Sequence, residues 1–308
     1  ASGKSSAQPF ALVKADFDND GMPDLAVSSA GESTGTLRIF RGNLGSVYPN
    51  APEAREAVAS GMPVGAPFLL PALDVSTPVT PEFMVAGDFD GDGNADLAVA
   101  KNGDDVLYVL PGVGNGTFGE ARSVAVTGTV TTVASGDVNR PDGRPELLVG
   151  VTNGRSSQIL VVSGVTVADG TVPVGIDLPG TVIDIAVGDV TGMRFADIVA
   201  STTAGVVLVP GRDSSRETPR LEFELVVSRP DVRSIALGDF SGGLRLDVAL
   251  LGDNGRIDLL VGPDPVEGTA KSSEKPANVE GFASTAAGAE RIVAANVSSR
   301  TGMDLVAL

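Results

Sequence analysis

The sequence predicts an all-β fold, a β-propeller built from four-stranded antiparallel blades. Two observations lead to this prediction. A nine-residue acidic pattern recurs six times in the 308 residues, mostly at intervals of about 50 residues. Between its copies, short segments rich in Val, Ile, Leu and Ala alternate with turns rich in Gly, Pro, Asn and Asp. For all-β repeats of this length, the propeller is the leading candidate.

Each repeat is expected to contain four short strands, with the acidic pattern between the first and the second. In the second repeat the expected strands are residues 83–87, 96–101, 106–110 and 122–126. In the fourth repeat they are residues 182–188, 197–201, 206–209 and 221–227. Since each blade buries its faces only against its neighbours, we expect residues 1–308 to form one domain.

The repeat frame sets the expected blade boundaries. The blades are residues 10–81, 82–129, 130–180, 181–230, 231–288 and, in part, 289–308. The last repeat supplies only about half a blade, because two strands of four are visible. We therefore predict a seven-bladed ring with an incomplete C-terminal blade, and a six-bladed ring closed by the N-terminal segment is the alternative.

Two segments are longer than the repeat requires. The first is an insertion, residues 44–81, with a short helix expected over residues 52–60 and apolar residues at 68–70. Such apolar residues dock either onto the protein itself or onto a partner, and packing within the protein is the commoner case. The second is a polar, small-residue-rich stretch, residues 262–280, which we expect to be flexible.

The two best copies of the acidic pattern each place four aspartates where they could surround one cation. They are residues 16–24 (Asp-Phe-Asp-Asn-Asp-Gly-Met-Pro-Asp) and 88–96 (Asp-Phe-Asp-Gly-Asp-Gly-Asn-Ala-Asp). Carboxylates at loop positions 1, 3, 5 and 9 supply several hard oxygens in one tight turn, which suits calcium. Glycine at position 6 permits the positive φ that folds the loop back. The predicted ligands are Asp16, Asp18, Asp20 and Asp24, and Asp88, Asp90, Asp92 and Asp96.

Further motifs follow these loops. Leu-Ala-Val-Ala follows at residues 97–100, Gly-Asn-Gly-Thr-Phe at 114–118, and a related turn, Arg-Gly-Asn-Leu-Gly, at 41–45. With them the chain resembles the FG-GAP or VCBS repeat, the blade of integrin α-subunit propellers and many bacterial surface proteins. The resemblance covers essentially the whole chain, although only two of the six loops are complete. It implies that each complete loop holds Ca²⁺, with the carbonyl oxygens of Met22 and Asn94 as fifth ligands.

The third loop, residues 137–146, has one extra residue. It keeps oxygen-bearing side chains at four positions: Asp137, Asn139, Asp142 and Glu146. These residues could hold a third, weaker calcium ion. Arg140 and Arg144 place positive charge beside this position, which favours an empty loop.

The fourth and fifth loops, residues 189–197 and 239–247, keep the first and last aspartates but lose the middle ones. The replacements are Thr191 and Met193 in one loop, and Ser241 and Gly243 in the other. The fourth, fifth and sixth loops each contain an arginine: Arg194, Arg245 and Arg300. One hypothesis is that the guanidinium replaces calcium by pairing with the remaining carboxylates. The alternative is that these arginines lie on a wet surface, where an ion pair contributes less than about 1 kcal/mol.

Composition excludes several classes of protein. The formal net charge is −17, and two bound calcium ions would leave it strongly acidic. Nucleic-acid binding needs clustered Lys and Arg, so it is excluded. No apolar run is long enough to span a bilayer, and we expect no direct membrane insertion.

The residue types needed for many active sites are missing. The sequence contains no histidine and no cysteine, which excludes Ser-His-Asp and Cys-His catalysis and histidine-ligated zinc. The regularly spaced aspartates are accounted for by the cation loops. We therefore predict a protein that is not an enzyme; a polysaccharide lyase is an alternative, because some propeller lyases carry similar loops.

The predicted function is a rigid protein-interaction module, either an adhesion protein or an accessory subunit of an extracytoplasmic complex. In related propellers, partners bind the face opposite the calcium loops. Here that face includes residues 30–35, 102–105, 152–156 and 202–205. A carbohydrate-binding lectin is the alternative, but with no Trp and two Tyr the chain has few aromatic faces for sugar stacking.

The calcium loops also suggest where the protein works. Sites of modest affinity stay filled where calcium is near millimolar, which favours an extracellular, cell-surface or periplasmic location. The chain begins at Ala1 without a signal peptide, as a processed protein or a segment of a longer one would.

Overall fold

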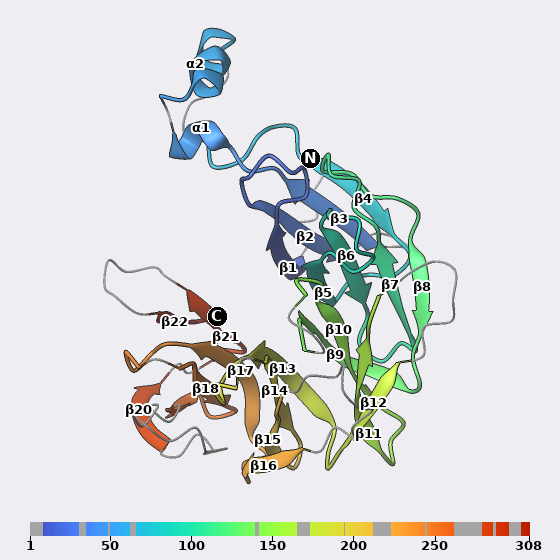
Figure 1. The fold of residues 1–308 in the computed structure, drawn as a ribbon, viewed down its shortest axis with the longest axis vertical. Helices are drawn as coiled ribbons and strands as arrows, with labels where there is room; N and C mark the ends of the chain where they lie inside the picture. The colour runs from blue at the N-terminus through green and yellow to red at the C-terminus, as the bar shows by residue number, and fades with distance from the viewer. Residues whose placement is uncertain are drawn as a thin grey trace, which may run out of the picture. The chain divides into compact units, whose positions relative to one another are not determined.

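A computed structural model shows a chain made almost entirely of β-strands (Figure 1). It describes residues 9–30, 35–48, 50–61, 66–138, 142–164, 173–193, 195–211, 223–243, 245–261, 279–285, 288–295 and 303–308. The elements, in chain order, are β1 (Pro9–Ala15), β2 (Asp24–Ala30), β3 (Gly35–Phe40), α1 (Leu44–Val47), α2 (Pro52–Ala59), β4 (Leu73–Thr77), β5 (Phe83–Gly87), β6 (Asp96–Ala100), β7 (Val106–Leu110), β8 (Arg122–Ala125), β9 (Thr129–Gly136), β10 (Glu146–Thr152), β11 (Ser157–Val162), β12 (Val174–Leu178), β13 (Val182–Gly188), β14 (Asp197–Thr202), β15 (Gly205–Val209), β16 (Glu224–Val227), β17 (Val232–Gly238), β18 (Asp247–Gly252), β19 (Arg256–Leu260), β20 (Val279–Thr285), β21 (Ile292–Ala295) and β22 (Asp304–Ala307).

The strands form antiparallel sheets in which sequential strands are neighbours. Five described sheets have four strands each, β1–β4, β5–β8, β9–β12, β13–β16 and β17–β20, and a sixth has two, β21 and β22. This confirms the predicted four-stranded blades, and the sixth repeat has two strands among the described residues. The seven-bladed ring and its six-bladed alternative stay predictions.

The predicted strand positions agree closely with the structure. Strands β5, β7 and β13 have the predicted bounds, and the other five strands of the second and fourth repeats differ by one to three residues at an end. The agreement has a physical reason. Strand β6 is buried on both faces, so its run of Leu, Ala and Val reads as a core strand.

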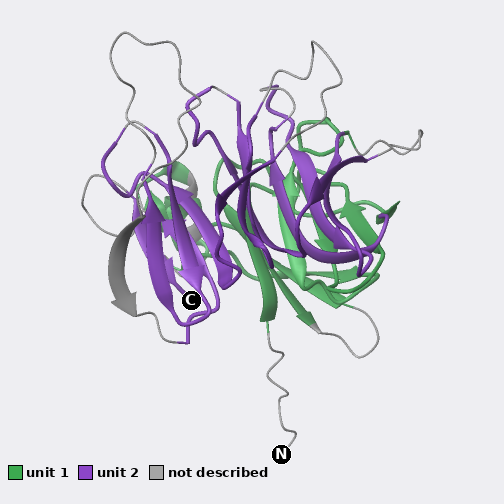
Figure 2. Cartoon of the chain, turned by 90° about the horizontal axis from the view of Figure 1, so that it is seen from below, with its two compact units in different colours: residues 1–125, 164–169 green, residues 126–163, 170–308 purple. Residues whose placement is uncertain are grey.

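The chain groups into two compact units, coloured in Figure 2. Unit 1 comprises residues 1–125 and 164–169, and unit 2 comprises residues 126–163 and 170–308. In unit 1, strand β1 contacts β5, so the sheets β1–β4 and β5–β8 pack face to face. Their shared core contains Phe17, Leu37, Ile39, Leu97 and Leu110, each almost inaccessible to solvent.

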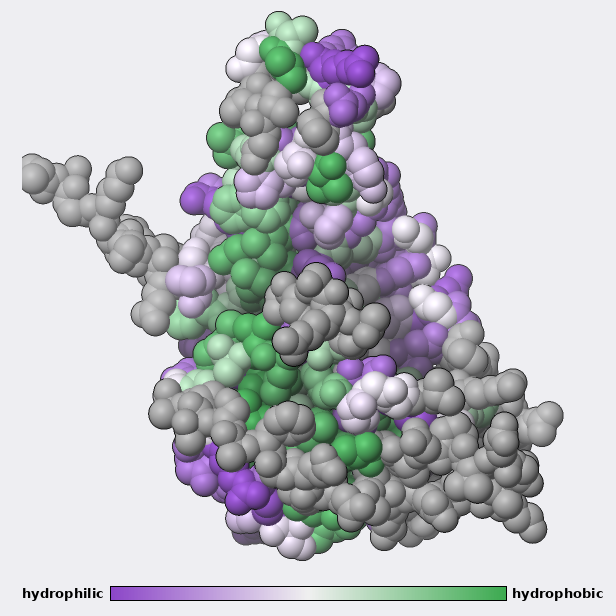
Figure 3. All heavy atoms as spheres, turned by 90° about the vertical axis from the view of Figure 1, so that its left-hand side faces the viewer, coloured by the Kyte–Doolittle hydropathy of each residue, from purple (hydrophilic) through white to green (hydrophobic). Residues whose placement is uncertain are grey.

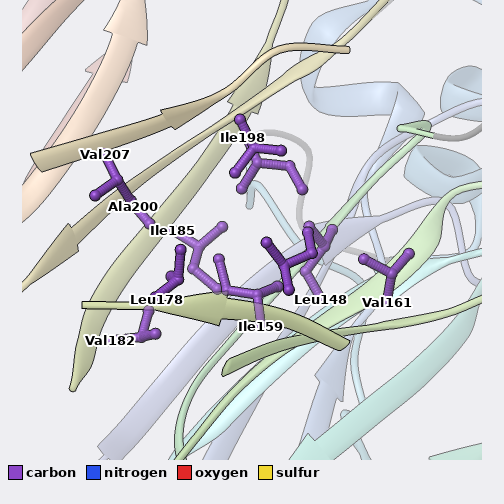
Figure 4. Packing of buried hydrophobic residues seen from close by; sticks show 11 residues of the cluster. Leu148, Ile159, Val161, Leu178, Val182, Ile185, Ile198, Ala200 and Val207 are labelled. Atoms are coloured by element: carbon purple, nitrogen blue, oxygen red, sulfur yellow. The ribbon is translucent and has the colours of Figure 1, made fainter. Parts of the chain in front are cut away.

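Unit 2 repeats this packing along the chain. Strand β13 contacts both β9 and β17, and β17 also contacts β21. Figure 4 shows the first of its cores, where Leu148 and Ile159 of one sheet meet Ile185 and Ile198 of the next. Burial of such apolar area between successive sheets is the main stabilising term for blades of this kind.

The insertion in unit 1 contains the predicted helix, which is α2, preceded by the shorter helix α1. Phe68 packs within the protein: its ring centroid lies 5.7 Å from that of Phe40. Apolar and polar side chains both reach the surface of the insertion, at the top of Figure 3, and Val47, Tyr48 and Val58 are exposed. Residues 262–278 of the second long segment lie outside the described residues. Within the described part of the chain, none of the helices has the length and apolar character that a bilayer crossing requires.

Candidate metal centre

The two complete acidic loops are hairpin connections in unit 1. Residues 16–24 join β1 to β2, and residues 88–96 join β5 to β6. The pairs Ala15↔Asp24 and Gly87↔Asp96 close the two hairpins at the same loop positions. Glycine at loop position 6 has the predicted positive φ, 85° at Gly21 and 88° at Gly93. A side chain at this position would strain the backbone, which explains the glycine.

Three carboxylates of each loop converge. One oxygen from each of Asp16, Asp18 and Asp24 lies within 4.8 Å of the others, and Asp88, Asp90 and Asp96 form the equivalent group. Calcium binds oxygen ligands at about 2.3–2.6 Å, so ligands on opposite sides of one ion are about 5 Å apart. The spacing of both groups therefore suits a single calcium ion.

The fifth-position aspartates lie outside these groups of three. Asp20 Oδ1 accepts a hydrogen bond from Met22 N at 2.8 Å, and Asp92 Oδ1 accepts one from Asn94 N at 2.8 Å. Each carboxylate thereby holds the turn of its own loop. The contribution of Asp20, Asp92 and the Met22 and Asn94 carbonyl oxygens to a metal site stays a prediction.

The third-position aspartates give the clearest indication of a cation. Asp18 Oδ1 and Asp90 Oδ1 are buried and have no hydrogen-bond partner among the described residues. Their second oxygens face arginines: Asp90 Oδ2 lies 3.1 Å from Arg122 Nη1, and Asp18 Oδ2 lies 3.9 Å from Arg41 Nη1. A buried carboxylate oxygen without a donor is costly, and a metal ion would satisfy it. The residues of both loops therefore fit calcium.

The ninth-position aspartates have a different role, because they fasten the loop to the rest of the blade. Asp96 is fully buried, and its two oxygens accept hydrogen bonds from Phe89 N at 2.8 Å and Gly112 N at 2.7 Å. The two oxygens of Asp24 accept equivalent hydrogen bonds, from Phe17 N at 2.9 Å and from Gly42 N at 2.7 Å. Each carboxylate thus joins the start of its loop to the turn after the third strand.

Burial changes the acidity of these carboxyl groups. Burial raises the pKa of Asp96 to about 6, while the hydrogen bonds from Gly112 and Phe89 act in the opposite direction. Burial and, to a lesser degree, repulsion from neighbouring aspartates also raise the pKa of Asp24 and of Asp18. Clustered acids that resist ionisation are stabilised as anions by a bound cation, so calcium would lower these pKa values.

The third loop shows part of the same arrangement in unit 2. Asp137 Oδ1 is buried without a hydrogen-bond partner in the described part of the chain, and Asp137 Oδ2 accepts from Gly143 N at 2.8 Å. Glu146 Oε2 accepts from Val138 N at 2.9 Å, which is the fastening role of position 9. Asn139 and Arg140 lie outside the described residues. A weaker third site at this loop stays a prediction.

The fourth and fifth loops keep the fastening contacts and the backbone contacts of the first-position aspartates, and they replace the middle aspartates. Asp197 Oδ2 accepts hydrogen bonds from Val190 N at 2.9 Å and Thr191 N at 2.8 Å, and Asp197 Oδ1 accepts from Gly211 N at 2.7 Å. The Arg245 guanidinium donates to the Thr191 carbonyl oxygen at 2.7 Å, so it joins the fifth loop to the fourth. Arg194 and Arg300, which the guanidinium hypothesis also named, lie outside the described residues.

Sequence analysis missed the glycines that receive the fastening carboxylates. A Cβ atom at Gly42, Gly112 or Gly211 would lie 2.7, 2.2 or 2.5 Å from a backbone carbonyl oxygen of the neighbouring acidic loop. Only glycine allows this close approach. The signal was present, because each of these glycines lies two residues after the end of the third strand of its blade.

Comparison with known proteins agrees with this reading of the repeats. The FG-GAP repeat matches residues 9–48, and the FG-GAP-like repeat matches residues 88–149. Each matched segment includes one complete acidic loop. A search of curated proteins gives no significant match.

Solved structures resemble the chain in fold. A chain in the crystal structure of BBS1N in complex with ARL6DN, soaked with mercury, has a TM-score of 0.57 at 13% identity, covering 98% of this chain and 75% of that one. The lead-soaked crystal gives 0.57 at 14% identity, with 98% and 76% covered. A chain in the structure of ctPRC2 in complex with H3K27me3 and H3K27M gives 0.50 at 14% identity, with 98% and 58% covered. Together with the repeated four-stranded sheets, these matches give an all-β, β-propeller-type fold.

Proposed function

We propose that this chain, which contains FG-GAP repeats, is a calcium-binding and non-catalytic β-propeller that serves as a rigid protein-interaction module. It would act as an adhesion protein or as an accessory subunit of an extracytoplasmic complex. Calcium would be held at two loops of unit 1, by the carboxylates of Asp16, Asp18 and Asp24 and of Asp88, Asp90 and Asp96.

One observation carries the calcium part of the proposal. Asp18 Oδ1 and Asp90 Oδ1 are buried without a partner in the described residues, each inside a group of three convergent carboxylates. Two independent loops of the same design share this feature. Calcium would neutralise mutually repelling carboxylates and brace the β1–β2 and β5–β6 hairpins.

The interaction part of the proposal rests on the turns between the second and third strands of the sheets, which lie at the strand ends opposite the acidic loops. In the turn between β10 and β11, Asn153 Oδ1 accepts from Arg155 N at 3.0 Å and from Ser156 N at 2.9 Å. In the turn between β14 and β15, Thr202 Oγ1 donates to Gly205 O at 2.8 Å. Turns held in one conformation lose little entropy on binding, which favours their use as recognition elements.

The proposed partner is a protein. BBS1N, which the chain resembles in fold, was crystallised in complex with ARL6DN. The short turns at residues 102–105, 152–156 and 202–205 are rich in Gly, Ser, Thr and Asn, residue types suited to hydrogen bonding with a protein surface. A non-catalytic role is supported by composition, since the sequence has no histidine or cysteine. Its first- and ninth-position loop aspartates accept hydrogen bonds from backbone amides, as Asp16 does from Gly21 N and Asp96 from Phe89 N.

The proposed location follows from the loops themselves. They offer three or four carboxylates on solvent-facing hairpins, a design suited to the modest affinities of extracellular calcium modules. Such sites fill where calcium is near millimolar. An extracellular, cell-surface or periplasmic protein meets this condition.

The calcium proposal is tested by counting bound ions. Non-denaturing mass spectrometry of the purified chain at millimolar calcium should give two bound ions, and Asp90→Ala and Asp18→Ala should each remove one. The matched control is Asp105→Ala, which replaces an exposed aspartate in the turn between β6 and β7 and should retain both ions. A chain that binds no calcium at millimolar concentration would contradict this part of the proposal.

The interaction proposal is tested by size-exclusion chromatography from the native source in calcium, with mass spectrometry of the fraction. A co-eluting protein that is lost on Asn102→Arg, in the turn between β6 and β7, would support it. Asn115→Arg, on the acidic-loop side of the same sheet, serves as the control and should keep the partner. Elution of the chain by itself at monomer mass would contradict the interaction module.

A further inference from the structure

The two complete acidic loops of unit 1 are in direct contact. Asn19, at position 4 of the first loop, donates from Nδ2 to Asn94 Oδ1 in the second loop at 2.8 Å. A second link lies beside it, because Gly116 N donates to Phe17 O at 2.9 Å. The rings of Phe17 and Phe118 add an edge-to-face contact with centroids 5.5 Å apart.

Both ends of the asparagine pair lie next to predicted calcium ligands. Asn94 donates from its backbone N to Asp92 Oδ1 at 2.8 Å and from Nδ2 to Asp92 Oδ2 at 2.9 Å, so Asp92 fixes the Asn94 side chain. Asn19 lies between Asp18 and Asp20 in the sequence and has a φ of 57°. It is the only non-glycine residue with positive φ among the described residues. A chain of contacts thus runs from Asp92 through Asn94 and Asn19 to the first loop.

The asparagine pair is also enclosed by the turn that follows β7. A Cβ atom at Gly114 would lie 2.4 Å from Asn94 Oδ1 and 2.6 Å from Asn19 Nδ2. The backbone of Gly114 therefore sits directly against both amide groups, with a φ of 73°. This packing limits the positions that the two side chains can take, so a displacement of one loop is transmitted to the other.

We propose that Asn19 and Asn94 are positioning residues that couple the two calcium sites, so that calcium in either loop raises the affinity of the other. This inference rests on the proposed function, because it requires both loops to bind calcium. With Asp92 as the predicted fourth carboxylate ligand, calcium in the second loop would fix Asp92, and through Asn94 it would hold Asn19 in its left-handed conformation. The first loop then loses less freedom when its own ion binds, and the effect is reciprocal.

Electrostatics alone predicts the opposite sign. A calcium ion in one loop reduces the negative potential at the other loop, which weakens binding of the second ion. This repulsion does not depend on the Asn19–Asn94 hydrogen bond. The two effects can therefore be separated by a variant that removes the bond and keeps every carboxylate.

The test measures the populations of the zero-, one- and two-calcium forms by non-denaturing mass spectrometry across a calcium titration. Asn19→Gly removes the side-chain link and keeps the positive φ, because glycine adopts this conformation freely. In the wild type, we expect the second ion to bind about fivefold more tightly than independent sites would allow. In Asn19→Gly, and in Asn94→Ala, the one-calcium form should accumulate.

Calorimetry on single-site variants provides the second measurement. In Asp90→Ala, which disables the second loop, the first loop should bind calcium about fivefold more weakly than it does in the wild type with the second loop filled. With Asn19→Gly in both backgrounds, this difference should vanish or reverse, because only the electrostatic repulsion between the two sites remains. The control is Asn102→Gly, an exposed asparagine at the other end of the β5–β8 sheet, which should leave the coupling unchanged.

The possible results distinguish a failure of the coupling inference from a failure of the proposed calcium binding. Two ions that bind independently in the wild type, or a coupling that Asn19→Gly leaves intact, would overturn the inference and leave the calcium proposal standing. A chain that binds no calcium would overturn both.

Discussion

The acidic loops of the two units have the same residue role at position 9 and different roles at position 3. Asp96 in unit 1 and Asp197 in unit 2 both accept hydrogen bonds from the start of their loop and from the glycine after the third strand. At position 3 the loops differ. Asp90 has a buried oxygen without a partner in the described residues, whereas the hydroxyl of Thr191 donates to Asp197 Oδ1 at 3.2 Å.

The difference separates structural residues from metal-specific ones. A ninth-position carboxylate is needed in either loop, because buried backbone amides require an acceptor. A third-position carboxylate adds negative charge that only a cation can balance. Threonine at this position supplies a hydrogen-bond donor instead, so the loop is satisfied without an ion. This explains why the fourth and fifth loops keep their last aspartates, Asp197 and Asp247, and lose the third-position ones.

The strongest test of this comparison is Asp197→Ala, which should destabilise the protein with or without calcium. The substitution leaves the amides of Val190, Thr191 and Gly211 without their acceptor in a buried site. We expect the unfolding free energy to fall by about 3 kcal/mol or more, measured by urea denaturation in calcium and in chelator. A loss seen only in calcium would mean that position 9 of this loop acts through a metal.

Much of the fold could be predicted from the sequence, because repetition supplied the information that a single segment lacks. Strands β5 and β13 follow directly from the position of the acidic pattern and the apolar runs around it. The convergence of Asp16, Asp18 and Asp24 is also a local property, since all three belong to one nine-residue hairpin loop.

Contacts between repeats could not be predicted in this way. Asn19 and Asn94 are 75 residues apart, and nothing in either loop indicates the other as its partner. The same is true of Arg245, whose hydrogen-bond partner, Thr191, is 54 residues away. These pairings depend on how successive sheets pack, which the spacing of the repeats constrains only loosely.

A smaller effect is expected for Arg245→Ala, which probes the contact between the fourth and fifth acidic loops. The Arg245 guanidinium donates to Thr191 O and lies against Gly192, where a Cβ would be 2.6 Å from Arg245 Cζ. We expect a loss of about 1 kcal/mol in unfolding free energy, with calcium binding unchanged. The control is Arg38→Ala, whose exposed ion pair with Asp74 should contribute less than about 0.5 kcal/mol. Equal losses in the two variants would place Arg245 among the ordinary surface arginines.

The smallest effect expected concerns pH, and it distinguishes the buried charge of Asp197 from its hydrogen bonds. Burial raises the pKa of Asp197 above its ordinary value, despite hydrogen bonds that act in the opposite direction. Because the native pKa exceeds the unfolded one, the stability linked to this proton is full below about pH 4 and is lost as pH rises through the native pKa. Asp197→Asn cannot titrate, so the wild type should exceed it in unfolding free energy by more at pH 4 than at pH 7. Urea denaturation in chelator measures this difference, and a gap that widens towards pH 7 would show that the native protein prefers the ionised carboxylate.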